Sequence, residues 1–281
     1  MKTPVRLFNR KNEYQISTGI NVGTKRFGKP NQDTVQTLLP GWFNSRPPLL
    51  VLSDGMGGYG GGEVASRIAV ETMLRVYRGS DLSAGFLVVL EKGVLEAHQA
   101  IASEAAQDER IAWMGCTIVA AILTQDEIFL ANVGDSRAYL INRDSVEQIS
   151  HDHSLVADQL RAGLITEEEA KNHPKKNILS LSLTGRREKA PPFLSTVKWK
   201  PGDSLLLCSD GLWGPVSETQ IQSIVLELDY QRATEKLVTL ANTRGGPDNI
   251  SVILAQHKGT KPISFEDLEE TSEGVYVVGN S

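Results

Sequence analysis

The sequence predicts an α+β protein built around one large domain. Short apolar runs of β-strand period, separated by turn residues, fill the middle of the chain. Two stretches of helical periodicity precede them and two more lie near the C-terminal end, so the helices come in pairs. A chain of 281 residues with 40% hydrophobic residues is long enough to bury a sizeable core.

The helical stretches are amphipathic. The first covers residues 62–78 and the second residues 82–107. Because these two are consecutive, we expect them to pack on the same face of a sheet. A second pair is predicted near residues 218–227 and 230–244. In the first stretch the apolar residues at helical spacing are Val64, Ile68, Met73 and Val76.

The β runs are short and bounded by turn residues. Those at 116–123, 127–133 and 137–141 follow one another closely, which predicts an antiparallel meander. Residues 150–192 break this pattern, with helical character at 155–162, a second helix start at Thr166, and several prolines and basic residues. We expect this segment, called the flap below, to be a mobile, partly helical insertion over a cleft. The remaining predicted strands are 14–22, 49–53, 193–199, 204–208 and a last one that opens after residues 245–249.

Charge and cysteine usage narrow the function classes. The 34 acidic residues outnumber the 29 basic ones, which gives a formal net charge of −5 and argues against a nucleic-acid surface. An excess of carboxylates suits divalent cations instead. Cys116 and Cys208 stand inside apolar runs, as buried reduced thiols do. With no secretory leader and no membrane-span pattern, we expect a cytoplasmic protein.

A glycine-rich motif at residues 51–62 organises the chain. An apolar run ends there on Asp54, and six glycines follow within eight positions. This places a carboxylate at a sheet edge with little side-chain bulk beside it, as metal and phosphate sites require. The alternative is a glycine turn with Asp54 as a helix N-cap. The pattern recurs at residues 205–211, where Asp210 closes another apolar run.

Several aspartates share this position at the boundary between an apolar run and a turn. If the strand ends converge, carboxylates this numerous repel one another and need cations. Oxygen-only ligands favour Mg²⁺ or Mn²⁺ over Zn²⁺, and two such ions about 3.5–4 Å apart would activate a shared water. The aspartates concerned are Asp33, Asp54, Asp135, Asp210 and Asp248.

Two other polar clusters have competing interpretations. Lys25, Arg26 and Lys29 lie in an irregular loop before Asp33 and offer donors to an anion, although a solvated basic turn has the same composition. His151 and His153 raise a metal-ligand alternative together with His173. The i, i+2 spacing points two rings apart on a helix, and no second pair at zinc spacing follows, so we discount it.

Seven motifs together resemble the metal-dependent protein serine/threonine phosphatases of the PPM, or type 2C, family in its bacterial form. They appear in family order over nearly the whole chain, from residue 23 to about residue 256, which makes chance agreement improbable. The motifs are NQD at 31–33, SDGMGG at 53–58, MGCT at 114–117, ANVGDSR at 131–137, HDHSL at 151–155, SDGLW at 209–213 and PDNISV at 247–252.

The resemblance implies a four-layer αββα sandwich of two antiparallel β-sheets flanked by pairs of helices. It implies that Asp54 bridges two Mn²⁺ or Mg²⁺ ions, that the Gly55 carbonyl ligates one of them, and that Asp210 and Asp248 complete the other shell. Three further roles are implied for Asp33, which would hold bound water, for Asp135, which with Asp210 would support a weaker third ion, and for Asn249, which would orient the site.

Two positions depart from the family pattern. The arginine that grips the substrate phosphate usually stands where this chain has Gly28, so Arg26, Lys25 and Lys29 compete for that role. Some relatives carry a histidine where this chain has Met56, so protonation of the leaving oxygen must come from another group.

The expected activity is hydrolysis of phosphoserine and phosphothreonine in proteins by a water that bridges two cations. A catalytically inactive phosphoprotein-binding regulator and a hydrolase of small phosphate esters are the alternatives. We expect phosphorylated proteins and a cognate serine/threonine kinase as partners, no nucleic acid or membrane, and a monomer. The phosphatase domain is predicted at residues 1–257 and a polar, acidic tail at 258–281.

Overall fold

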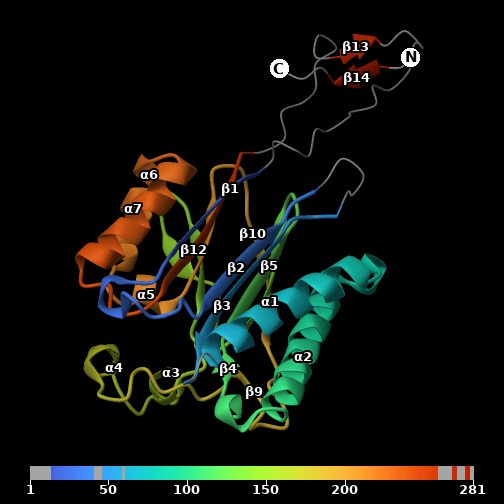
Figure 1. The fold of residues 1–281 in the computed structure, drawn as a ribbon. Helices are drawn as coiled ribbons and strands as arrows, with labels where there is room; N and C mark the ends of the chain where they lie inside the picture. Colours follow the sequence, from blue (N-terminus) through green and yellow to red (C-terminus); the bar gives the residue numbers. More distant parts are fainter. Residues whose placement is uncertain (1–13, 41–45, 59–60, 259–267, 271–275, 279–281) are drawn as a thin grey trace.

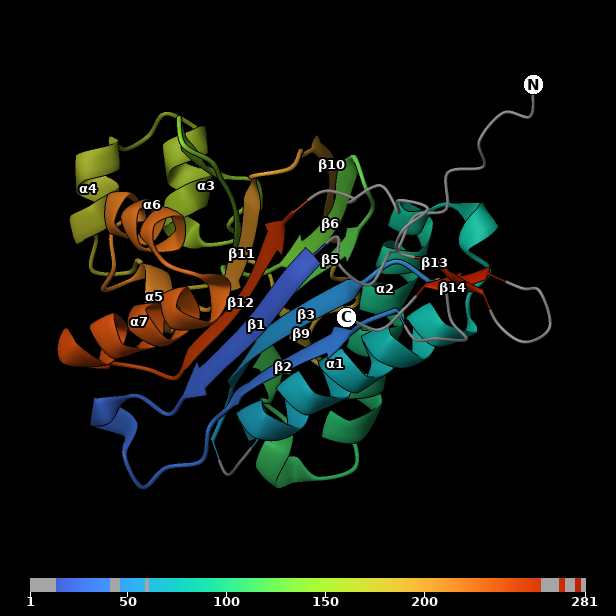
Figure 2. The same cartoon turned by 90° about the horizontal axis from the view of Figure 1, so that it is seen from above.

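The computed structural model of the protein describes residues 14–40, 46–58, 61–258, 268–270 and 276–278. Two antiparallel sheets lie face to face, and helices cover the outer face of each (Figures 1 and 2). The four-layer sandwich predicted for this chain is therefore confirmed. Within the described ranges, no helix is both long and apolar enough to cross a membrane.

The larger sheet has seven strands. Six of them follow the order β10-β6-β5-β3-β4-β9, and β2 pairs with β3 off this path. Their bounds are β2 Asp33–Leu38, β3 Leu49–Met56, β4 Gly115–Cys116, β5 Ile118–Leu123, β6 Glu127–Val133, β9 Leu183–Thr184 and β10 Phe193–Lys198.

The smaller sheet has five strands in the order β1-β12-β11-β7-β8. The meander predicted for residues 116–141 is wrong at its third strand, because β5 and β6 pair but β7 leaves for this second sheet. The connection passes so close to Thr117 that a Cβ on Gly134 would lie 2.5 Å from a Thr117 methyl carbon. The five strands are β1 Tyr14–Asn21, β7 Arg137–Ile141, β8 Val146–Gln148, β11 Ser204–Cys208 and β12 Ile250–His257.

Helix pairs complete the layers, as the periodicity predicts. Helices α1 (Gly61–Gly79) and α2 (Phe86–Ala105) cover the larger sheet. Helices α6 (Glu218–Glu227) and α7 (Tyr230–Thr243), with the short α5 (Asp210–Trp213), cover the smaller sheet.

Strand alternation divides the apolar core into three clusters. On β3, Leu49 and Val51 face α1 and α2, whereas Leu50 and Leu52 face the other sheet. All four are fully buried, so both faces of this strand contribute to the hydrophobic stabilisation of the fold.

The flap contains helices α3 (Leu155–Arg161) and α4 (Glu167–Asn172), close to the predicted helical segments. The Ser154 side chain caps α3, and Thr166 forms a capping box with Glu169 at α4. The flap is anchored at its base, where Leu155 N donates to Ile178 O and Ser180 N donates to His153 O.

Most of the predicted tail lies outside the described residues. The parts within them form β13 (Leu268–Glu270) and β14 (Tyr276–Val278), which pair with each other. Cys116 and Cys208 are free and buried, as expected.

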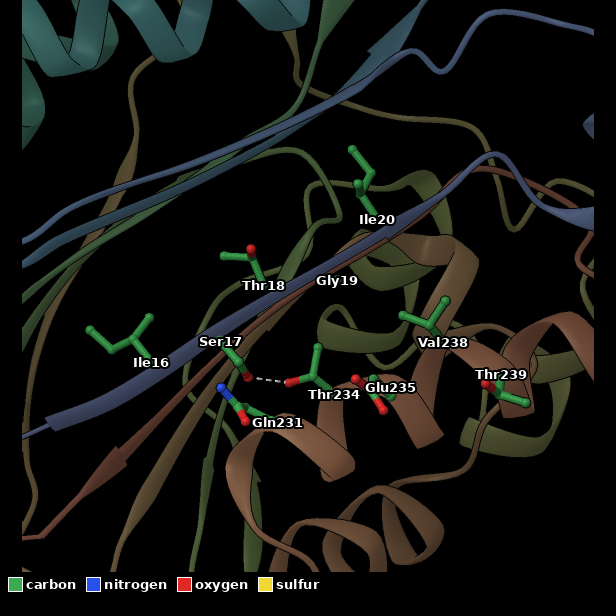
Figure 3. A pocket seen from close by; sticks show the side chains of 10 residues that line it. All are labelled: Ile16, Ser17, Thr18, Gly19, Ile20, Gln231, Thr234, Glu235, Val238 and Thr239. Atoms are coloured by element: carbon green, nitrogen blue, oxygen red, sulfur yellow. Dashed lines mark hydrogen bonds between the residues drawn. The ribbon is translucent and has the colours of Figure 1, made fainter.

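An open groove of about 850 Å³ runs between β1 and α7 (Figure 3). Helix α7 comes so close to the strand that a Cβ on Gly19 would lie 2.8 Å from a Thr234 methyl carbon. The groove is lined by none of the predicted site residues, so its hollow shape is unrelated to the carboxylate cluster described next.

Candidate metal centre

Asp33 and Asp54 are cross-strand partners on β2 and β3. The Asp33 side chain is 5% exposed, and its Oδ2 accepts a hydrogen bond of 2.9 Å from Ser209 Oγ. The Asp54 backbone is fixed by Thr117, whose Oγ1 accepts from Asp54 N at 3.0 Å. The pairing of two strands therefore sets two carboxyl groups side by side.

Asp210 and Asp248 reach the same region from the second sheet. Asp210 begins α5 directly after β11, and Asp248 stands two residues before β12, the strand that pairs with β11. The two connections touch, since a Cβ on Gly211 would lie only 1.9 Å from the Asn249 carbonyl oxygen. Ser209, next to Asp210, bonds Asp33, which links both sheets at this end of the sandwich.

Asp135 lies in the chain that crosses from β6 to β7 and is 8% exposed. Its backbone carbonyl accepts a hydrogen bond of 3.0 Å from Trp213 Nε1, at the end of α5. The crossing that broke the predicted meander thus brings a fifth carboxylate toward Asp210, whose pKa its charge raises.

Gly55 explains why the central motif is rich in glycine. A Cβ at this position would lie 2.0 Å from the Gly62 carbonyl oxygen and 2.5 Å from the Gln32 carbonyl oxygen. Gly55 N donates to that Gln32 oxygen at 3.0 Å. Helix α1 begins only at Gly61, so the alternative of Asp54 as its N-cap is wrong.

Burial and the charges of neighbouring carboxylates raise the pKa values of Asp33, Asp54 and Asp210. Burial raises the pKa of Asp33 to about 6, and burial followed by the charge of Asp135 raises that of Asp210 to about 7. The pKa of Asp54 is raised well above its ordinary range by burial, and then by Asp33, Asp210, Asp135 and Asp248 in that order. One carboxyl thus experiences the charge of all the others.

The donor chemistry fits hard divalent cations. The Oδ1 atoms of Asp33 and Asp210 are buried, and no nitrogen or hydroxyl donor of the described residues reaches them. A cation would satisfy both atoms and remove the repulsion, and all-oxygen ligands suit Mn²⁺ and Mg²⁺. In the described part of the chain, no three His, Cys, Asp or Glu side chains are yet close enough to enclose an ion.

Arg26 is the basic residue that reaches the carboxylates. Its Nη1 lies 2.6 Å from Asp248 Oδ1, and its Nη2 donates to Gln32 Oε1. Lys25 and Lys29 are exposed. The structure thus brings one of the three candidate phosphate ligands into the cluster, where it pairs with a predicted metal ligand.

Comparison with known proteins agrees with this geometry. Residues 23–255 match the family described as Protein phosphatase 2C. The chain belongs to this family. A serine/threonine phosphatase Stp from Listeria innocua is 38% identical over 215 residues, which are 75% of this chain and 85% of that protein.

Solved structures of type 2C phosphatases share the fold. Stp1 from Staphylococcus aureus has a TM-score of 0.81 at 30% identity, over 92% of this chain and 100% of that one. The catalytic domain of PstP, solved in complex with 2 manganese ions, has a TM-score of 0.75 at 31% identity, over 87% and 98% of the two chains.

Asn249, predicted to orient the site, is buried and bridges two segments of this type 2C domain. Its Oδ1 accepts from Gln32 N at 2.9 Å, and its Nδ2 donates to Val22 O at 3.0 Å. These bonds tie the start of β12 to the loop that carries Arg26.

Sequence reasoning missed Gln32 and Thr117 as site residues. Gln32 accepts from Arg26 and donates from Nε2 to Gly57 O at 3.0 Å, so it joins the basic loop to the glycine motif. Thr117 holds Asp54 and shares a 2.7 Å hydrogen bond with Ser136, beside Asp135. Their position inside the NQD and MGCT motifs was the available signal.

The His151 and His153 rings do not point apart as a helix would require. His151 and His153 precede α3, so helical geometry does not apply, and their ring centroids are 5.3 Å apart. His153 Nδ1 accepts from Gly134 N at 3.2 Å, and the His151 ring stacks on Phe193. Among the described residues, no third His, Cys, Asp or Glu side chain joins the pair in a group that could hold a metal ion.

Proposed function

We propose that this type 2C protein is a Mn²⁺- or Mg²⁺-dependent phosphatase that hydrolyses phosphoserine and phosphothreonine in proteins. The observation that carries the proposal is the convergence of carboxylates from both sheets, with buried oxygen atoms on Asp33 and Asp210 that no donor of the described residues satisfies. Family relatives named serine/threonine phosphatases support the substrate class.

In this proposal each aspartate has a distinct task. Asp54, the Gly55 carbonyl, Asp210 and Asp248 would hold two cations, and Asp135 with Asp210 a weaker third. When bound, the cations would neutralise charge on the phosphoryl oxygens and would lower the pKa of an attacking water. Asp33 would accept a hydrogen bond from that water and orient it, because Ser209 already fixes the position of its carboxyl group.

Arg26 would hold the substrate phosphate. Its guanidinium offers a planar fork that matches phosphate oxygens, and Gln32 supports it from one side. In this proposal Asp248 turns toward a cation and its contact with Arg26 Nη1 is broken. Nη1 of Arg26 can then donate to a phosphate oxygen. Lys25 and Lys29, exposed in the same loop, would strengthen the attraction of the anion.

The cellular location, the partners and the oligomeric state are inferred from the composition and from the proposed phosphatase activity. We propose a cytoplasmic signalling enzyme that acts opposite a cognate serine/threonine kinase and works as a monomer without a membrane or nucleic-acid partner. Its phosphatase domain would cover residues 1–257, with residues 258–281 as a tail. The acidic net charge and the buried reduced cysteines support this placement.

Substitution of the proposed ligands tests the function. Asp54→Ala and Asp210→Ala should each lower Mn²⁺-dependent turnover of a phosphothreonine peptide by a factor on the order of 10³, because cation chemistry supplies several kcal/mol. Asp144→Ala is the matched control, since Asp144 is exposed in the turn between β7 and β8. Turnover within tenfold of the unmodified protein in both site variants would reject the proposed site.

A further inference from the structure

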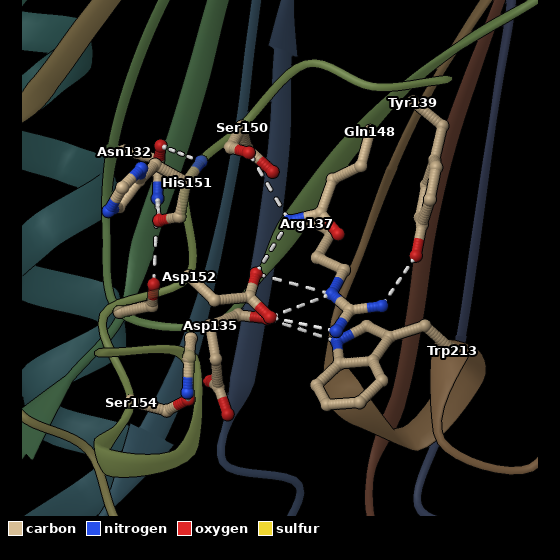
Figure 4. A network of polar contacts seen from close by, with 12 residues as sticks. Asn132, Asp135, Arg137, Tyr139, Gln148, Ser150, His151, Asp152, Ser154 and Trp213 are labelled. Carbon is tan, nitrogen blue, oxygen red and sulfur yellow. Dashed lines mark hydrogen bonds and ion pairs between the residues drawn. The ribbon is translucent and has the colours of Figure 1, made fainter. Parts of the chain in front are cut away.

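Residues from three family motifs, none of them a proposed cation ligand, meet around one largely buried side chain (Figure 4). Arg137 ends the ANVGDSR motif and begins β7. Asp152 lies in HDHSL at the start of the flap, and Trp213 ends SDGLW and α5. Their convergence is unexplained by cation binding alone, so it calls for a separate role.

Arg137 uses its whole guanidinium in this cluster. Nε donates to Asp152 Oδ1 at 3.2 Å, Nη2 donates to Asp152 Oδ2 at 2.8 Å, and Nη1 donates to the Tyr139 hydroxyl at 2.8 Å. The guanidinium carbon lies 3.7 Å from the centre of the Trp213 ring. The side chains of Arg137 and Asp152 are only 19% and 11% exposed. A bidentate pair stacked on an indole has a defined geometry that a lysine cannot reproduce.

The cluster acts on the carboxylate site through Trp213. The stacked ring points its Nε1 at the Asp135 carbonyl, 3.0 Å away, and the same residue ends the four-residue helix that Asp210 begins. The ring held by Arg137 therefore fixes the backbone at Asp135 and the far end of the helix that presents Asp210. The side chains of Asp33 and Asp248 are held by other partners, Ser209 and Arg26.

Asp152 extends the cluster into the flap. Its Oδ1 accepts from Gln148 Nε2 at 2.7 Å, and its backbone carbonyl accepts from Arg161 Nη1 at 3.1 Å, from the end of α3. Gln148 thus holds the carboxylate that orients Arg137, and Arg161 holds the backbone of the same residue.

We propose that Arg137, Asp152 and Trp213 form a positioning unit for Asp135 and Asp210, and that this unit controls the affinity of the weaker third cation site, which both carboxylates would hold, more strongly than that of the other two. The inference rests on the proposed function, since it assigns these aspartates to a cation. Groups that orient metal ligands typically change metal affinity by 10–100-fold when they are substituted.

Mn²⁺ titration calorimetry of the full chain tests the proposal with Trp213→Phe and Arg137→Lys. Trp213→Phe keeps a ring under the guanidinium but removes the donor to Asp135, and Arg137→Lys keeps the charge but removes the fork. We expect the affinity of the weakest Mn²⁺ site to fall 10–100-fold in each, with a smaller loss at the tighter site that shares Asp210 and none at the other. The Mn²⁺ concentration for half-maximal turnover should rise equally, and high Mn²⁺ should restore the maximal rate.

The control is Arg110→Lys, because Arg110 pairs with Asp108 at the surface with 78% of its side chain exposed. Its isotherm should match that of the unmodified protein. Isotherms of both site variants that superimpose on that reference, equal weakening of all sites, or an unmodified protein with only two sites would overturn the inference. If Arg137→Lys does not fold, as judged by circular dichroism, Trp213→Phe still decides. An unmodified protein that binds no Mn²⁺ would instead reject the proposed function.

Discussion

Two buried charged clusters lie next to each other in this fold and differ in how their charges are balanced. In the Arg137 cluster the buried carboxylate of Asp152 meets a guanidinium at 2.8 Å. In the carboxylate cluster, buried oxygen atoms of Asp33 and Asp210 meet no donor among the described residues, and neighbouring acids raise the pKa of Asp54. A cluster complete within the chain holds structure in place, whereas an incomplete one requires ligands from outside.

The same substitution should therefore have opposite effects on the two clusters. Asp152→Asn leaves the Arg137 charge buried without its counter-charge and should lower the free energy of unfolding by about 3 kcal/mol. Asp54→Asn removes a carboxylate that the others repel and should raise the free energy of unfolding of the metal-free protein by about 1 kcal/mol. Urea denaturation with a chelator present measures both changes. Destabilisation by both would contradict the comparison.

The backbone beside the carboxylate cluster should not tolerate a side chain at Gly55. Gly55→Ala forces a methyl group to within 2.0 Å of the Gly62 carbonyl oxygen, and overpacking of this kind costs about 1–3 kcal/mol. Gly58→Ala is the matched control from the same motif, because a Cβ there has no atom of the described residues within 4 Å. Thermal melts of the two variants compare them. Equal melting temperatures would show that the close approach at Gly55 does not constrain the site.

The smallest expected effect is the pH dependence of the metal-free protein. The folded-state pKa values of Asp33 and Asp135 are raised to about 6 and that of Asp210 to about 7, from an ordinary value of 3.8. Protonation of these groups therefore favours the folded state. Their contribution is fully present below pH 3.8 and is lost as the pH rises through 6 to 7.

Melting temperatures between pH 5 and pH 8 give the readout for this prediction. With chelator present, the melting temperature should fall by a few degrees across this range, since ~1 kcal/mol corresponds to roughly 2–4 °C in a domain near this size. Saturating Mn²⁺ should reduce the slope, because the cation replaces the protons. A melting temperature that rises with pH in the metal-free protein would reverse the sign and exclude carboxyl repulsion as the cause.

Local sequence patterns predict the buried strands and the position of the aspartates at the strand ends, for a physical reason. Apolar runs such as the one at β11 must be buried, and the acids at their ends mark where the chain leaves the core. Strand β2, with the sequence DTVQTL, was missed because four of its six residues are polar and its burial is partial. The aspartates were identified because a charged residue directly after an apolar run is conspicuous in the sequence.

The remaining features depend on contacts between distant segments. Nothing in Gly134-Asp135-Ser136 distinguishes a hairpin turn from a crossing between sheets, so the destination of β7 was not predictable. Arg26 and Asp248 lie 222 positions apart, and their ion pair follows only from the way the β1 and β12 ends meet. Likewise, Trp213 in a family motif does not reveal that its indole nitrogen faces the Asp135 carbonyl.

The central claim is that aspartates from both sheets gather around cations at this end of the sandwich. A crystal structure of the protein grown with Mn²⁺ and measured at the manganese absorption edge tests it most directly. We expect at least two anomalous peaks within ligand distance of Asp54, one of them shared with Asp210 and Asp248, and Asp248 turned away from Arg26. An anomalous map without a peak near these three carboxylates would contradict the account.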